Sequence, residues 1–93
     1  MAGRSVLLRL QNNIKIRRFD AGDAHGGLAA LEDMLRIAPD HATLWREAAL
    51  VNQQLDHVGA ALRCFERFLD LVPEGEAAGQ VRNAMEELRA RLN

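Results

Sequence analysis

Two stretches decide the fold: residues 28–39 read LAALEDMLRIAP and residues 62–73 read LRCFERFLDLVP. When the chain is shifted by 34 positions, four residues of the two stretches become identical, and Pro39 on Pro73 is one of these matches. Apolar residues recur in both stretches every three or four positions, the period of a helix with one buried face. Each proline ends its helix, because proline lacks a backbone N–H. The sequence therefore predicts two copies of a helical unit with this 34-residue period.

The pattern on either side of these stretches predicts an all-α fold of five helices. We expect them over about 5–19, 23–37, 41–55, 58–71 and 76–92. Ser5, Asp23 and Asp40 are the expected N-caps, since short polar side chains accept bonds from the first N–H groups of a helix. Short connections make neighbouring helices antiparallel, which gives two hairpins and a closing helix.

The apolar positions of the last four helices fall on one face of each, and we expect these residues to form the core. They are Leu28, Leu31, Leu35 and Ala38; Leu44, Trp45, Ala48, Val51 and Leu55; Leu62, Phe65, Phe68 and Leu69; and Ala77, Val81, Ala84, Met85, Leu88 and Leu92.

Composition narrows the class of protein. The chain has 93 residues, so we expect a single domain over 1–93. Its 48% hydrophobic content is enough for a packed core, and its net charge of −1 gives no overall attraction to nucleic acid or an anionic membrane. The single cysteine excludes an internal disulfide, and we find neither a signal peptide nor a membrane-spanning run. We expect a cytoplasmic protein.

The second unit carries the signature residues of the tetratricopeptide repeat, namely Trp45, Ala61, Phe65 and Pro73. The chain therefore resembles that family, whose unit is a helix-turn-helix of about 34 residues. The first unit matches less well, with Gln11 at the tryptophan position and Gly27 at the small-residue position, where we expect close helix packing. The resemblance implies a right-handed array with repeats over about 8–41 and 42–75 and a capping helix over about 76–92.

A closer resemblance is to the C-terminal tetratricopeptide segment of bacterial SirB-type proteins. It rests on residues 7–15 (LLRLQNNIK), the Gly22-Asp23 turn, Met34-Leu35 with Ala38-Pro39, and residues 44–48 (LWREA). That family places a transglutaminase-like domain before this segment. The present sequence lacks such a domain, so no catalytic Cys, His, Asp set can be carried over, and the chain would be a stand-alone or excised repeat segment.

Candidate catalytic and metal-binding residues are few. Cys64 has no histidine at helical spacing, and we expect a partly buried structural thiol rather than a nucleophile. His25, His41 and His57 stand 16 residues apart at helix starts, not at metal-ligand spacing, and we expect solvated turn residues. We therefore predict a protein that is not an enzyme and uses no cofactor or metal.

The first helix is basic, with five cations and no acid before Asp20: Arg4, Arg9, Lys15, Arg17 and Arg18. A solvated face is the favoured interpretation, and an acidic protein partner or neighbouring domain comes second. Nucleic acid is the least favoured, because no aromatic residues are interleaved with the cations.

In tetratricopeptide arrays the first helix of each pair lines a concave groove, and register gives the groove candidates. They are Arg9, Asn12, Ile16 and Phe19 in the first unit and Thr43, Arg46, Leu50 and Gln53 in the second. Asn12 and Asn13 are unusual in mid-helix, because their side chains compete for backbone hydrogen bonds. They either contact a ligand or bond a neighbouring loop.

Two further expectations concern this groove. Ile16 and Leu50 occupy positions where a clamp for C-terminal carboxylates needs polar residues, so we do not expect that clamp. Arg46 and Glu47 are alternatively expected to pair with residues of the first helix.

The leading hypothesis is a protein-interaction module that holds a peptide or a neighbouring domain on its concave face. Its protein-binding residues are Arg9, Asn12, Asn13, Ile16, Phe19, Arg46, Leu50 and Gln53. Three alternatives stay open. The module packs on an upstream transglutaminase-like domain of the same polypeptide, it associates with itself through its unprotected ends, or it binds nucleic acid weakly through the basic first helix. No membrane partner is expected.

Overall fold

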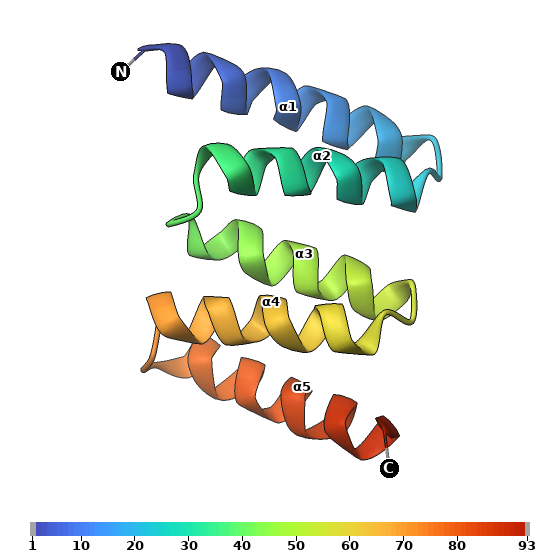
Figure 1. Cartoon of the computed structure of the whole chain (residues 1–93), viewed down its shortest axis with the longest axis vertical. Helices are drawn as coiled ribbons and strands as arrows, with labels where there is room; N and C mark the ends of the chain where they lie inside the picture. The colour runs from blue at the N-terminus through green and yellow to red at the C-terminus, as the bar shows by residue number, and fades with distance from the viewer. Residues whose placement is uncertain (1, 93) are drawn as a thin grey trace.

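The computed structural model describes residues 2–92. It contains five helices: α1 (Ala2–Asp20), α2 (Ala24–Ile37), α3 (Ala42–Gln54), α4 (Val58–Leu71) and α5 (Glu76–Leu92). Successive helices are antiparallel and form a column, with the two termini at opposite ends (Figure 1). The predicted all-α array of two hairpins and a closing helix is confirmed. No helix within the described residues is both long and apolar enough to cross a bilayer.

Of the N-caps predicted for the first two helices, one is wrong and one is correct. α1 begins at Ala2, so Ser5 lies inside the helix and is not its N-cap. In α2 the prediction is confirmed, because the Asp23 carboxylate accepts a hydrogen bond of 2.8 Å from the Gly26 N–H. Gly22, in the turn between these helices, has a φ of 77°, a conformation that glycine adopts without steric cost.

The predicted cap of the third helix is also wrong. His41, not Asp40, stands at the N-cap position of α3. The Asp40 carboxylate instead accepts a hydrogen bond of 2.7 Å from the guanidinium of Arg4 on α1. A charge-assisted bond to arginine competes with helix capping for the same carboxylate, and only the three-dimensional arrangement brings Arg4 within reach.

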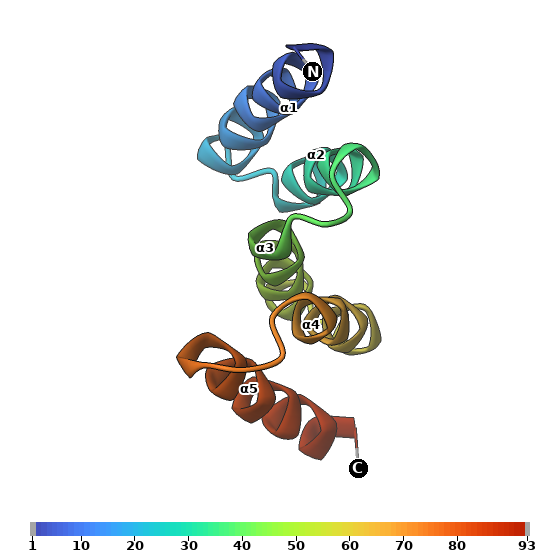
Figure 2. The same ribbon diagram turned by 90° about the vertical axis from the view of Figure 1, so that its left-hand side faces the viewer.

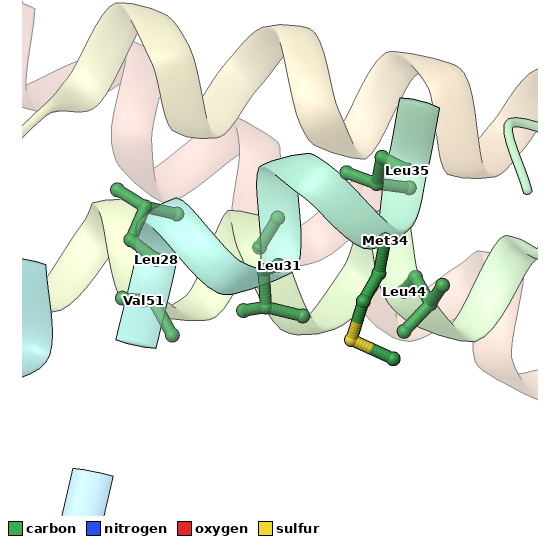
Figure 3. Close-up of a cluster of buried hydrophobic side chains, with 7 residues drawn as sticks. Leu28, Leu31, Met34, Leu35, Leu44 and Val51 are labelled. Atoms are coloured by element: carbon green, nitrogen blue, oxygen red, sulfur yellow. The ribbon is translucent and has the colours of Figure 1, made fainter. Parts of the chain in front are cut away.

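Two apolar clusters form the core. The first joins α2 and α3, with Leu28, Leu31, Met34, Leu35, Leu44, Ala48 and Val51 (Figure 3). The second joins α3, α4 and α5, with Ala49, Ala61, Phe65, Phe68, Val81, Met85 and Leu88. The predicted core residues lie in these clusters or against them, with the exception of Ala38 and Leu92. Ala38 is buried, as predicted, but belongs to neither cluster. Leu92 is exposed at the end of α5, where it contacts neither cluster of the described residues.

Trp45 connects the two clusters, since it packs against both. Its indole N–H donates a hydrogen bond of 2.8 Å to the carbonyl of Pro39, and the guanidinium of Arg67 on α4 lies 5.4 Å from its ring centroid. In the described residues, close backbone contacts join only consecutive helices. α1 and α3, and likewise α2 and α4, are therefore connected through side chains alone.

Candidate functional site

The first helices of the two hairpins lie on one side of the array together with α5. Figure 2 shows α2 and α4 on the opposite side of the column. We call the surface of α1, α3 and α5 on their shared side the α1–α3–α5 face. The sequence-predicted groove residues belong to α1 and α3.

Ile16 and Leu50 are the apolar residues that the repeat register assigns to this face. They stand 34 residues apart, and so occupy the same position in the two repeats. Their exposed fractions are nearly equal, 46% and 47%. Equivalent residues of a helical repeat point in the same direction, so these two side chains present a repeated apolar contact to solvent.

Asn12 and Arg46 form a second equivalent pair, each one turn before its apolar residue. Asn12 is half-buried, and its amide makes no hydrogen bond to another described residue. Arg46 is also half-buried and donates a hydrogen bond of 3.0 Å to the side-chain oxygen of Gln80 on α5. The amide of Asn12 therefore keeps its donors and its acceptor available on this face.

A partly buried ion pair links α1 to α3. The ammonium of Lys15 lies 2.7 and 2.8 Å from the two carboxylate oxygens of Glu47. The expected pairing of Glu47 with the first helix is confirmed, whereas Arg46 reaches α5 instead. Since the Lys15 side chain is only 13% exposed, this pair is screened less than one at the surface.

Phe19 is only partly available for binding. Its ring packs against the first cluster and against Gly27, where an added Cβ would lie 2.3 Å from the ring. The expected close packing at Gly27 is thus confirmed. Phe19 also lines a hollow of about 450 Å³ between the end of α1 and α3, together with Glu47 and Gln54.

The remaining predicted residues are more scattered. Gln53 is half-buried on α3, while Arg9 and Asn13 are exposed on α1. Arg9 and Asn13 are one helical turn apart, on a different row of α1 from Asn12 and Ile16. The structure therefore groups Asn12, Ile16, Arg46 and Leu50 by repeat position, and it leaves Arg9 and Asn13 exposed on α1.

Sequence reasoning missed a cleft of about 670 Å³ between α2 and α4. Its floor is Trp45, Ala48 and Asn52 of α3, and its rim carries Glu32, Arg36, Arg63, Glu66 and Arg67. The cleft could not be predicted because the sequence does not give the distance between α2 and α4. The signal that could have indicated the cleft was the charged pattern that flanks the apolar stripe of both helices.

Cys64 lies against this cleft without the environment of a nucleophile. It is half-buried, and burial raises the pKa of its thiol, an effect larger than the opposing ones from Arg63 and the Asn52 amide. A thiol with a raised pKa is protonated at neutral pH and therefore a poor nucleophile.

The three histidines are exposed, as predicted. The fold brings the rings of His25 and His57 to a centroid distance of 6.0 Å, and Nδ1 of His57 lies 3.2 Å from the Asn52 side-chain oxygen. No group of three or more metal-binding side chains occurs in the part of the chain that the structure describes.

Comparison with known proteins adds one finding to this geometry. A family model described as tetratricopeptide repeat matches residues 14–86. A search of the curated proteins finds no match. The tetratricopeptide part of the expected resemblance is confirmed, and the relationship to SirB-type proteins stays a hypothesis.

Proposed function

Since this chain belongs to the tetratricopeptide repeat family, we propose that it is a non-catalytic module that binds a peptide or a neighbouring protein domain on its α1–α3–α5 face. Repeats of this family generally mediate protein–protein interaction, and domains built from them are typically not enzymes. The proposal places the interaction at Ile16 and Leu50, with Asn12 and Arg46 beside them.

The observation that carries this proposal is the repeated exposure of Ile16 and Leu50. Both lie at one repeat position with nearly half of their surface in solvent. A bound chain would cover both with apolar side chains, and each buried methylene stabilises the complex by about 0.8 kcal/mol. The amide of Asn12 offers hydrogen bonds to a peptide backbone, and the guanidinium of Arg46 offers them to a carboxylate.

The side-chain links between α1, α3 and α5 support the proposal. The Lys15–Glu47 ion pair joins α1 to α3, and the Arg46–Gln80 hydrogen bond joins α3 to α5. These contacts hold the binding residues at a set separation before a ligand arrives. A preformed surface loses less conformational entropy on binding, which favours affinity.

The alternatives receive less support from the contacts. Three of the five cations of α1 are engaged in ion pairs, namely Arg4 with Asp40, Lys15 with Glu47 and Arg18 with Asp23. Nucleic-acid binding through α1 would therefore rely on Arg9 and Arg17. Packing on an upstream domain would use the same α1–α3–α5 face and stays a second form of the proposal.

Selection from a phage-displayed library of random 12-residue peptides tests the face. Synthetic copies of the selected peptides are titrated by fluorescence anisotropy against the wild type and an Ile16→Asp, Leu50→Asp variant. We expect the variant to raise the Kd at least about tenfold, since it replaces two apolar contacts with charges.

Leu71→Asp is the matched control, because Leu71 is an exposed apolar residue at the end of α4, outside the α1–α3–α5 face. We expect this variant to change the Kd by less than about twofold. Circular dichroism confirms that each variant is folded. Selected peptides that bind the Ile16, Leu50 variant as well as the wild type contradict the face assignment.

A further inference from the structure

The outer side of α1 carries a second, larger apolar surface, which the proposed function does not use. Val6, Leu7, Leu10 and Ile14 are each between 40% and 54% exposed. Val6, Leu10 and Ile14 follow one another at intervals of four residues, so they form a row along the helix with Leu7 beside it. We call these four residues the outer apolar row.

The second repeat shows what covers this position. Leu10 and Ile14 correspond, 34 residues later, to Leu44 and Ala48 of α3. Leu44 and Ala48 are buried in the first cluster against α2, the helix that precedes α3 in the column (Figure 3). Leu44 is 6% exposed, whereas Leu10 is 54% exposed. The outer apolar row is thus the surface on which a repeat receives its preceding helix.

A basic edge runs beside the outer apolar row. Arg9, Asn13 and Arg17 also follow at intervals of four residues, on the adjacent row of α1. Neither Arg9 nor Arg17 has an ion pair among the described residues, in contrast to Arg4, Lys15 and Arg18. The unneutralised charge of α1 is therefore concentrated along one edge of the apolar surface.

We propose that the outer apolar row is a docking site for an amphipathic helix of a partner protein, with acidic residues beside its apolar stripe. The partner helix packs on Leu10 and Ile14 as α2 packs on Leu44 and Ala48. Its carboxylates lie against Arg9 and Arg17, where unlike charges favour association and the correct register. Asn13 supplies a hydrogen-bonding group between the two guanidinium groups.

Two other occupants fit the surface less well. A second copy docked through the same row would bring the Arg9–Arg17 edges of both molecules to one interface, where like charges repel. The outer side of α5 is no substitute, because it carries Arg82, Glu86 and Arg89. A membrane surface would favour tryptophan or phenylalanine in the apolar row. The one aromatic residue of α1, Phe19, packs against Gly27 instead.

The chain supplies a suitable probe, because α2 is the helix that covers the equivalent surface. Residues 23–38 contain three acidic residues and one arginine. The labelled synthetic peptide of these residues carries Gly26→Ala and Gly27→Ala to favour helix, and a lactam bridge between His25→Lys and Ala29→Glu. His25 and Ala29 are exposed in α2, so the bridge lies away from the contact surface. The bridge is needed because short isolated helices are marginal in water.

Fluorescence anisotropy of this probe with the intact chain tests the docking site. We expect Leu10→Asp to raise the Kd at least about tenfold, because an apolar contact is lost and a carboxylate faces the acidic probe. The matched control is Ile16→Asp, on the same helix with similar exposure, and we expect a change of less than about twofold. A probe with Glu32→Lys and Asp33→Lys should bind at least about fivefold more weakly at low salt.

Three results would overturn the proposal. The probe binds Leu10→Asp as tightly as the wild type. Analytical ultracentrifugation shows a wild-type dimer that Leu10→Asp converts to a monomer, which assigns the surface to a second copy. The wild type co-sediments with vesicles of phosphatidylcholine and phosphatidylserine and Leu10→Asp does not, which assigns it to lipid. Because Ile16 belongs to the other face, these results are independent of the proposed function.

Discussion

α1 and α3 are the first helices of two successive hairpins, and they carry apolar residues at the same repeat position. Leu44 of α3 is buried against α2, whereas Leu10 of α1 is exposed. The side chain is leucine in both cases, so the difference comes from the neighbour: α3 has a helix packed on that side, and α1 has none within residues 2–92. In a stacked array the position of a helix in the column, and not its own pattern alone, decides which faces are buried.

Truncating each of the two leucines to alanine should give the largest difference in the free energy of unfolding. We expect Leu44→Ala to lower the free energy of unfolding by about 2–4 kcal/mol, because it leaves a cavity between α2 and α3. Leu10→Ala should lower it by less than about 0.5 kcal/mol, since solvent already surrounds that side chain. Urea unfolding followed by circular dichroism measures both values. Equal losses would show that Leu10 is buried in solution.

We expect a smaller effect on stability from a substitution that changes the packing inside the first hairpin. Gly27 of the first hairpin corresponds to Ala61 of the second. We expect Gly27→Ala to destabilise the chain by about 1–2 kcal/mol, because its Cβ would displace the Phe19 ring, despite the better helix propensity of alanine.

The matched control for Gly27 is Gly79 on α5, where an added Cβ would meet nothing within 4 Å. Gly79→Ala should stabilise the chain by about 0.5–1 kcal/mol through helix propensity alone. Thermal and urea unfolding measure whether each substitution raises or lowers the free energy of unfolding. Stabilisation by Gly27→Ala as well would mean that Phe19 moves aside without cost.

A third test compares two ion pairs that α1 makes with later parts of the chain. The Lys15 side chain is 13% exposed, so Lys15→Ala leaves the carboxylate of Glu47 partly buried without its partner. We expect a loss of about 1–2 kcal/mol in the free energy of unfolding. Arg4→Ala removes an exposed partner of Asp40, and we expect a loss clearly smaller than that of Lys15→Ala. A larger effect at Arg4 would reverse this ranking.

The smallest expected effect is a pKa shift at Asp40. The hydrogen bond from Arg4, together with its positive charge, holds the pKa of this carboxyl below its usual value of 3.8. The associated stabilisation is present above that usual value and is lost as the pH falls through the lower folded-state pKa. Arg4→Ala should therefore raise the pKa of Asp40, measured by NMR titration of its side-chain carbon. An unchanged pKa would show that the pair does not persist in solution.

Much of the fold could be predicted from residues 28–39 and 62–73 alone, because periodicity and proline act locally. The limits of α4 and α5 agree with the predicted ranges. The N-caps Ser5 and Asp40 could not be predicted correctly. Residues before Ser5 continue the helix, and Asp40 bonds to Arg4, which lies 36 positions earlier in the chain.

The candidate site likewise has features that could be predicted from the sequence and features that could not. The shared direction of Ile16 and Leu50 follows from the 34-residue repeat and could be read from the sequence. The partner of Arg46 could not, because Gln80 reaches it only through the stacking of α5 on α4. The cleft above Asn52 likewise depends on the distance between α2 and α4. A local sequence pattern carries no information about that distance.

The restriction of backbone contacts to consecutive helices has a kinetic consequence. Each contact between neighbours closes only a short loop of chain, so little loop entropy is lost before packing begins. Helical proteins with such local contacts fold within microseconds to milliseconds, on the order of the fastest single domains. Trp45 packs against both clusters, so its fluorescence is a natural optical probe for following the assembly of the two halves in time.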